Sequence, residues 1–268
     1  MNSRVFYQGR PADADTLAAL ALVNYGHFTT MQVRDGAVRG LDLHLERLQQ
    51  GNVTLFGGRL DEAALRFQLT TALDAFGAND ASMRITAFSR VFDFRAPLRE
   101  VPVDLVVSFA APSLSPTTAL RVRPVAFVRA LPHVKHVGTF PLFQLRREAI
   151  AAGFDDALFV DARGYLVEGS VWNLGLWDGQ SVTWPKGPAL AGIQEQLLRV
   201  GLDRLGVPQQ IRAVHLDELG CFSAAFACNS RGHQPIAAVG ASLLPQSGLP
   251  DVLDQAMATQ PWQPIRQP

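Results

Sequence analysis

The chain has few of the features that mark a secreted, membrane-spanning or nucleic-acid-binding protein. Cysteine occurs only twice in 268 residues, at Cys221 and Cys228, which is too few for a disulfide framework and lacks the spacing of a metal site. No run approaches the ~20 apolar residues that span a membrane, and the first apolar stretch, 17–23, follows aspartates rather than the basic segment of a signal peptide. Acidic and basic residues are equal at 24 each, without a basic cluster. We therefore expect a cytoplasmic protein with no membrane, nucleic-acid or metal partner.

Lysine is also scarce, and this scarcity bears on function. Only Lys135 and Lys186 occur among the 24 basic residues, so arginine serves nearly everywhere a cation is needed. A guanidinium cannot form a Schiff base, whereas a primary amine can. A lysine that survives in such a chain can therefore mark a position that requires an amine, although an exposed lysine is more often a simple surface charge.

The remaining composition is that of a globular protein, with 48% hydrophobic and 18% charged residues. Apolar alternation and turn residues predict strands, and apolar residues at helical spacing predict helices. The expected strands are 28–34 with a short partner after the Asp35-Gly36 turn, 82–88, 103–109, 120–128, 157–161, 166–168 and 172–177. The expected helices begin near residues 42, 61, 141 and 193.

This order predicts an α+β chain of two domains. The segment APSLSPTT, 111–118, carries two prolines and several hydroxyl residues and is the best candidate for a linker. We expect a small N-terminal α+β domain at 1–112, a linker at 113–119, and a larger C-terminal sheet domain at 120–268. The tail from Leu244 is rich in proline and glutamine, and we expect it to be surface-bound or partly disordered.

Four elements could carry chemistry together: Lys135 in LPHVKHVGTF, Glu168 in LVEGS, Arg47 on a helix beside His44, and the loop-to-helix junction Gly192-Ile193-Gln194. Each also has an ordinary structural explanation, such as an exposed charge or an unremarkable helix start.

The sequence resembles the class IV (fold type IV) aminotransferases that depend on pyridoxal 5′-phosphate (PLP), a family that includes branched-chain and D-amino-acid aminotransferases and aminodeoxychorismate lyase. The resemblance runs from about Asn24 to Val239. It rests on NYGHFTTMQV, HLERL, VKH, LAGI, CNSRGHQPI and, most specifically, REAIAAGFDDALFVDARGYLVEGSVWNLGLW at 147–177.

The resemblance implies a role for each matching residue. Lys135 would form the Schiff base with PLP and move the substrate proton, and Glu168 would hold the ring nitrogen in its protonated form. The phosphate would be bound by the Arg47 guanidinium and by backbone N–H groups at a helix N-terminus. The cofactor-binding residues implied in this way are Arg47, Glu168, Asn173, Ile193, Gln194 and Ser230, and the substrate contacts are Tyr25, Thr30 and Arg95, with Arg90 or Arg84 as weaker alternatives to Arg95.

The chain departs from the family pattern at three positions. Gln194 stands where threonine is usual in the phosphate loop. Phe140 stands where many transaminases have a tyrosine five residues after the lysine, and aminodeoxychorismate lyases also lack that tyrosine. His27 is unusual in the shortened motif Tyr25 to Thr30, where it is either a pocket residue or a buried structural histidine.

The resemblance leaves several functions open. The main expectation is an aminotransferase that exchanges an amino group between an amino acid or amine and a 2-oxo acid, acting as a homodimer. The alternatives are 4-amino-4-deoxychorismate lyase on the same scaffold, a cofactor-free Schiff-base aldolase that uses Lys135, and an inactive member that keeps the fold as a binding module. Arg47 and Glu168 would have no function in the last two.

Overall fold

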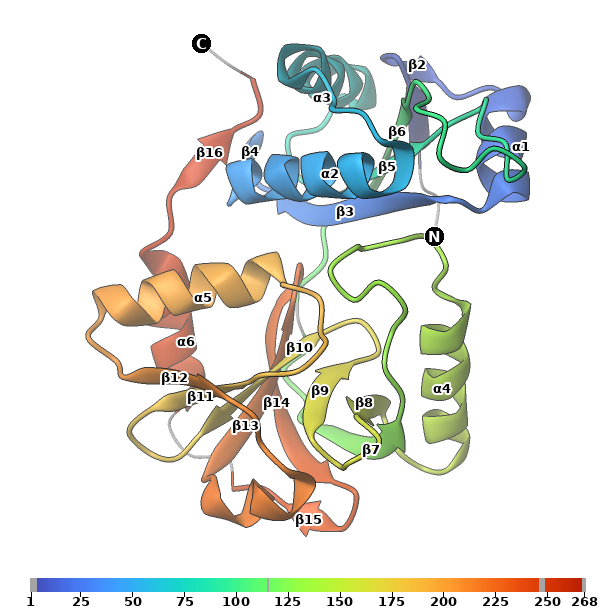
Figure 1. Ribbon diagram of the computed structural model, residues 1–268. Helices are drawn as coiled ribbons and strands as arrows, with labels where there is room; N and C mark the ends of the chain where they lie inside the picture. The colour runs from blue at the N-terminus through green and yellow to red at the C-terminus, as the bar shows by residue number, and fades with distance from the viewer. Residues whose placement is uncertain (1–3, 115, 246–248, 267–268) are drawn as a thin grey trace. The chain divides into compact units, whose positions relative to one another are not determined.

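The computed structural model describes residues 4–114, 116–245 and 249–266 and consists of two compact units (Figure 1). The first unit contains the chain up to Ser113, the segment Val134–Gly138 and the chain from Trp262. The second unit contains Leu114–His133 and Thr139–Pro261. The expected domains, 1–112 and 120–268, differ from these units because residues 134–138 and the C-terminal segment belong to the first unit.

An antiparallel sheet forms the centre of the first unit. Its strand order is β2-β1-β6-β5-β3, from β1 (Arg4–Tyr7), β2 (Arg10–Pro11), β3 (Gly26–Val33), β5 (Ala81–Phe88) and β6 (Asp104–Ala110). Along β3, alternate residues such as Met31 and Val33 are buried in the hydrophobic core. The strands expected at 28–34, 82–88 and 103–109 are therefore present, with ends displaced by one or two residues.

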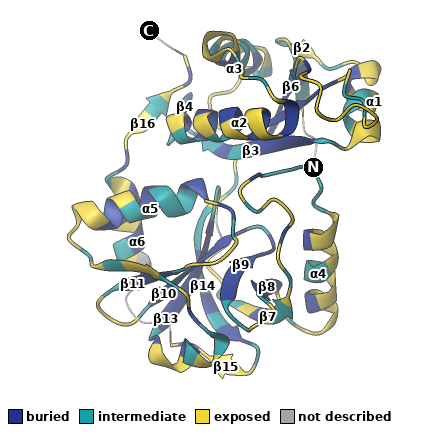
Figure 2. Cartoon of the chain, in the orientation of Figure 1, coloured by how far each residue is buried: buried dark blue, intermediate teal, exposed yellow. Residues whose placement is uncertain are grey.

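Helices α2 (Leu41–Phe56) and α3 (Glu62–Phe76) pack on this sheet, and α1 (Ala14–Val23) precedes β3. Both α2 and α3 end at a glycine, Gly57 and Gly77, with a positive φ angle that favours residues without a side chain. In Figure 2 the strands are largely dark blue, whereas the helices carry exposed residues in yellow. This pattern is what amphipathic helices covering a buried sheet produce.

Two distant segments complete the first unit. The short strand β4 (Ala37–Arg39) pairs antiparallel with β16 (Trp262–Pro264) from the end of the chain. The segment Val134–Gly138 runs along β3, which would otherwise be the edge of the sheet: an isolated antiparallel bridge joins His27 and His136. This second addition positions Lys135 against β3.

The second unit is built on one curled sheet with the order β12-β11-β10-β13-β14-β7-β8-β9, and β15 pairs with β14. The pairs β11–β12, β14–β7 and β7–β8 are parallel and the other pairs in this order are antiparallel. Strand β9, at the end of the order, also contacts β10. The strands are β7 (Leu120–Ala126), β8 (Asp156–Val160), β9 (Leu166–Gly169), β10 (Asn173–Trp177), β11 (Val182–Pro185), β12 (Gln209–Arg212), β13 (Ala224–Asn229), β14 (Gly232–Val239) and β15 (Ser242–Leu243).

Helices α4 (Phe140–Ala151), α5 (Ile193–Arg204) and α6 (Leu249–Ala258) and the 3-10 helix η1 (Leu216–Cys221) pack around this sheet. The expectation of a surface-bound or disordered tail was wrong for residues 249–266. There, Leu253 and Ala256 are buried, and α6 packs so closely on α5 that a Cβ on Gly201 would lie 2.2 Å from the Ala256 carbonyl oxygen. None of the described helices combines the length and the apolar character that crossing a membrane requires.

Candidate active site

Lys135 is held against β3 of the first unit by backbone hydrogen bonds on either side of it. The Phe28 N–H donates to the Lys135 carbonyl oxygen at 2.9 Å, and the Val137 N–H donates to the Gly26 carbonyl oxygen at 2.9 Å. The Lys135 Nζ lies 5.0 Å from the centre of the Phe28 ring, within the range of a cation–π contact. The backbone hydrogen bonds to β3 therefore fix the position of the Lys135 backbone from which the amine extends.

A second cation faces the same ring. The guanidinium carbon of Arg84 lies 3.6 Å from the centre of the Phe28 ring, and Arg84 Nε donates to the Thr86 hydroxyl at 3.1 Å. The β3–β5 register pairs Phe28 with Thr86 and Thr30 with Arg84, so all four side chains share one face of the sheet. Burial lowers the pKa of Arg84. This face presents an amine and a partly desolvated guanidinium, which is a suitable environment for a substrate carboxylate.

Arg47 is oriented by a buried hydroxyl on β3. Its guanidinium donates to the Thr29 hydroxyl oxygen, and the same oxygen lies 2.6 Å from His44 Nδ1. Burial, together with the positive charges of Arg47 and Lys135, holds the pKa of His44 well below its usual range. His44 is thus neutral. Since Thr29 accepts from Arg47, its own hydrogen is directed to Nδ1, an assignment that follows from the hydrogen-bond network.

His27 lies between β3 and α2 and is 2% exposed. Burial lowers its pKa to about 4, with a smaller contribution from the Arg47 charge. Gly51 on α2 provides the space for the ring: a Cβ there would lie 2.6 Å from His27 Nδ1. Of the two roles that the sequence allowed, this environment favours a neutral structural histidine.

Glu168 is a buried carboxylate of the second unit, 5% exposed on β9. Its Oε1 lies 3.4 Å from Nε of the equally buried Arg129, and its Oε2 accepts the Leu190 N–H at 3.2 Å. A buried carboxylate next to a guanidinium and a backbone donor is favoured in its charged form. The arrangement can hold a proton on a basic nitrogen placed against Glu168.

Asn173 on β10 fastens the loop that leads into α5. Its side-chain amide donates to the Leu190 carbonyl oxygen at 2.8 Å, and a Cβ on Gly192 would lie only 1.9 Å from Asn173 Oδ1. Gly192 is the N-cap of α5, and no side chain caps the helix there. The first-turn N–H groups, including those of Ile193 and Gln194, therefore form the kind of helix N-terminus that binds phosphate.

Ser230 lies in the turn between β13 and β14. It lies two residues after Cys228, which pairs with Asn173 across the β10–β13 ladder. The sheet therefore brings the residues near Ser230 and those near the start of α5 to the same region of the second unit.

The substrate residues expected from the sequence have different environments. Tyr25 stacks on Phe92, with ring centres 4.1 Å apart, and its hydroxyl donates to the Leu55 carbonyl oxygen at 3.3 Å. Arg95 lies on a surface loop with its side chain 75% exposed, 3.7 Å from the Asp93 carboxylate. Arg84, by contrast, is partly buried and shares the Phe28 ring with Lys135.

Comparison with known proteins decides the family. The model of the amino-transferase class IV family matches residues 26–239, which is most of the chain. The chain belongs to the class IV aminotransferase family. No curated protein matches its sequence.

Solved structures of class IV enzymes have the same fold. The 4-amino-4-deoxychorismate lyase of Pseudomonas aeruginosa is 26% identical, with 95% of this chain and 98% of that chain covered and a TM-score of 0.80. The branched-chain aminotransferase of Thermoproteus uzoniensis is 23% identical over 96% and 93%, with a TM-score of 0.78. A hypothetical aminotransferase from Mycobacterium tuberculosis in a PLP-bound form is 19% identical over 96% and 99%, with a TM-score of 0.78.

These findings confirm the α+β, two-domain fold type IV architecture and PLP as the cofactor, and they show that the protein is an enzyme of the PLP-dependent class IV family. The residues present fit that cofactor. A lysine amine, a guanidinium oriented by Thr29, an uncapped helix N-terminus at Gly192 and the buried Glu168 supply the donor and acceptor types that PLP needs.

Two residues of this region were missed by sequence reasoning. Arg129 sits in an irregular segment, VRALPH, where an arginine carries no motif, and only the fold brings it to Glu168. Glu195 is an acidic residue in the first turn of α5, which is common at exposed helix starts. Its partial burial could not be read from the sequence.

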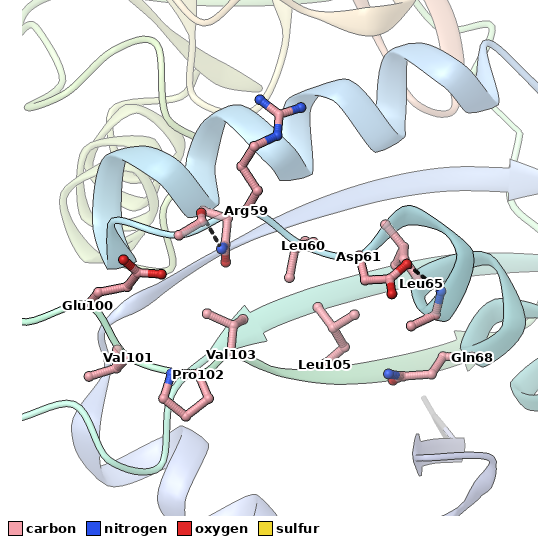
Figure 3. Close-up of a pocket in the computed structure, with 13 residues that line it drawn as sticks. Arg59, Leu60, Asp61, Leu65, Gln68, Glu100, Val101, Pro102, Val103 and Leu105 are labelled. Atoms are coloured by element: carbon pink, nitrogen blue, oxygen red, sulfur yellow. Dashed lines mark hydrogen bonds between the residues drawn. The ribbon is translucent and has the colours of Figure 1, made fainter.

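A separate cavity of about 570 Å³ lies in the first unit, near the end of α2 and the start of α3 (Figure 3). Figure 3 shows Glu100 at one end of it, Gln68 at the other, and the apolar Val103 and Leu105 between them. None of the expected cofactor-binding or substrate residues lines this cavity, so it is distinct from the candidate site.

Proposed function

We propose that this class IV enzyme is an aminotransferase that moves an amino group between an amino acid, or another amine, and a 2-oxo acid. The observation that carries the proposal is the pair of cations around Phe28. Lys135 supplies a primary amine, and Arg84 supplies a guanidinium that suits a carboxylate on the same substrate. Amino acids and 2-oxo acids both have a carboxylate next to the reacting carbon.

The proposed function assigns cofactor-binding roles to several residues. Arg47, the Ile193 and Gln194 N–H groups and Ser230 bind the cofactor phosphate, and Asn173 holds the loop before Gln194 in place. Glu168, with Arg129 beside it, keeps a proton on the ring nitrogen. When bound, PLP supplies an electron-withdrawing ring that takes up the electron pair released at the substrate carbon.

Lys135 would hold the cofactor through its primary amine, and the same amine would carry a proton to and from the substrate α-carbon. Arg84 binds the substrate carboxylate, with Arg95 as the alternative, and Tyr25 and Thr30 line the substrate pocket. We further propose that the enzyme acts in the cytoplasm and as a homodimer. Sedimentation of the holoenzyme at about twice the 29.1 kDa chain mass would support the dimer, and a monomer would contradict it.

The presence of only two lysines permits a direct test of the aminotransferase. Purified protein should be yellow, lose this colour on adding an amino-acid donor and regain it on adding a 2-oxo acid. Lys135→Ala should lose at least ~10³-fold in rate, whereas Lys186→Ala, in an exposed loop, should match the wild type. Equal loss in both variants, or none in Lys135→Ala, would refute the role of Lys135.

One observation favours a second function, the 4-amino-4-deoxychorismate lyase. Phe140 stands where many transaminases carry a tyrosine, and the 26%-identical structure from Pseudomonas aeruginosa has this lyase activity in its name. Incubation with aminodeoxychorismate separates the two functions. Release of pyruvate without any amino acceptor would establish the lyase, and a strict requirement for a 2-oxo acid would establish the aminotransferase.

A further inference from the structure

The cavity of about 570 Å³ in the first unit has a wall that buried side chains of α2 fix in place. The Gln49 amide donates to the Leu60 carbonyl oxygen at 2.6 Å, and its oxygen accepts the Leu60 N–H at 2.9 Å. The Asn52 amide donates to the Gly58 carbonyl oxygen at 2.8 Å. Gln49 is 7% exposed and Asn52 is 2% exposed. The loop between α2 and α3 is therefore held at two points, which gives the cavity the preformed wall that is usual for small-molecule sites.

The floor of this cavity is apolar. Leu65, Val101 and Leu105 line it and are buried, and the lining residues Leu60 and Val103 pack against the hydrophobic core of the first unit. The volume lies within the range of about 300–1,000 Å³ that small-molecule sites occupy. A ligand with an apolar body would remove both its own surface and these side chains from water.

The charged groups around the cavity favour a cation. Glu100 lies at one end, where Gly58 leaves room for its carboxylate: a Cβ on Gly58 would lie 2.8 Å from Glu100 Oε1. Asp61 also lines the cavity, and one of its oxygens accepts the Ala64 N–H at 3.2 Å. Figure 3 shows that the guanidinium of Arg59, the basic residue of the lining, is directed away from the apolar floor.

Neither carboxylate is neutralised by a neighbouring cation. Among the residues that the structure describes, none forms an ion pair with Glu100 or Asp61. A positive charge on a ligand would therefore be attracted to this cavity, and a negative charge would be repelled.

We propose that this cavity binds a small organic cation with an apolar body, such as a substituted ammonium compound. Its positive nitrogen lies at the Glu100 end, and its body packs against Val103 and Leu105. The Gln68 amide at the other end can donate or accept a hydrogen bond, and so selects ligands with a polar group there. This inference does not rest on the aminotransferase activity, because none of the expected cofactor-binding or substrate residues lines the cavity.

Titration calorimetry of the full-length protein with benzyltrimethylammonium tests this site. The probe combines a permanent positive charge with an apolar ring. Its quaternary nitrogen carries no hydrogen, so it cannot form a Schiff base or act as an amino donor. The cations Lys135 and Arg84 repel it from the candidate active site.

Three variants separate the charge of the cavity from its volume. Glu100→Gln removes the carboxylate but keeps the size of the side chain. Ala64→Phe adds a ring to the cavity lining from an exposed position on α3, without entering the hydrophobic core. Glu148→Gln, at an exposed position on α4 of the second unit, is the matched control because it changes the net charge equally. Circular dichroism establishes that each variant is folded.

We expect the wild type and Glu148→Gln to bind the probe with the same dissociation constant. Glu100→Gln should bind it about fivefold more weakly at low salt, and this difference should shrink at about 1 M salt, because salt screens exposed charges. Ala64→Phe should weaken binding at least ~10-fold, because the ring occupies space that the probe needs. Saturable binding that is absent from the wild type, equal in Glu100→Gln and the wild type, or unchanged in Ala64→Phe would overturn the inference.

Discussion

The hydroxyl oxygen of Thr29 lies 2.6 Å from Nδ1 of the neutral His44 and accepts a hydrogen bond from Arg47. Thr29→Val removes this hydroxyl, so Arg47 loses one hydrogen-bond acceptor that orients it and His44 loses a hydrogen-bond donor. Hydrogen bonds to charged groups contribute about 1.5–3 kcal/mol, so PLP affinity should fall at least ~10-fold. Equilibrium dialysis measures the loss. Thr54→Val, on the exposed face of α2, is the control, and equal affinity in both variants would contradict the role of Thr29.

Replacing Arg84 with methionine should weaken substrate binding, whereas the same replacement at Arg95 should have little effect. Arg84→Met removes the cation that shares the Phe28 ring with Lys135, so the KM for a carboxylate-bearing donor should rise about 10–100-fold, with a smaller change in kcat. Arg95→Met removes an exposed side chain and should change either constant less than ~2-fold. Steady-state kinetics with the identified amino donor measures KM and kcat for both variants. A larger rise in KM for Arg95→Met than for Arg84→Met would show that Arg95 binds the substrate carboxylate.

Glu195 predicts how stability depends on pH. Burial raises its pKa to about 7 in the folded protein, so the folded state binds more protons than the unfolded state between about pH 4.5 and pH 7. Wild-type stability should therefore fall across this window and level off above pH 7. Glu195→Gln lacks this loss and should exceed the wild type by ~2 kcal/mol at pH 8 but not at pH 4.5. Urea unfolding of the apoenzymes measures the difference in the free energy of unfolding. A variant that is no more stable than the wild type at pH 8 would show that the ionised carboxylate does not destabilise the fold.

Replacing Arg129 should destabilise the protein, although Arg129 lies in an irregular segment. Arg129→Met removes the guanidinium 3.4 Å from the buried Glu168 carboxylate, and breaking a buried ion pair from one side costs about 3 kcal/mol. Arg123→Met, on the exposed side of β7, should stay within ~0.5 kcal/mol of the wild type. Chemical denaturation separates the two variants, and Glu168→Gln added to Arg129→Met should restore part of the loss.

The helices and strands were predicted best where the sequence carries local signals. The turn at Asp35-Gly36 and the helical spacing of apolar residues after positions 42 and 61 are short-range signals, so β3 and the starts of α2 and α3 lie within one or two residues of their expected positions. The tail differs from its prediction because the helical spacing of Leu249, Leu253, Ala256 and Met257, all buried, outweighs its proline and glutamine content.

The sequence suggests candidate site residues where a motif of the family coincides with a residue type that the chemistry requires. Lys135, Glu168 and Arg47 were chosen because an amine, a carboxylate and a guanidinium each have a chemical role to which the other residue types are poorly suited. Arg84 received little weight, because its value depends on the β3–β5 register that sets it over Phe28. Arg129 and the burial of Glu195 depend on how loops and helices pack, and single-sequence patterns do not encode such distant contacts.

The pairing of β16 with β4 has a consequence for synthesis of the chain. β4 leaves the ribosome early, but its partner Trp262–Pro264 follows only after the whole of the second unit has been made. The two-stranded sheet of β4 and β16 therefore cannot form until synthesis of the second unit is complete. The first unit is begun first but completed last. A stalled or truncated chain would lack β16, the strand that pairs with β4.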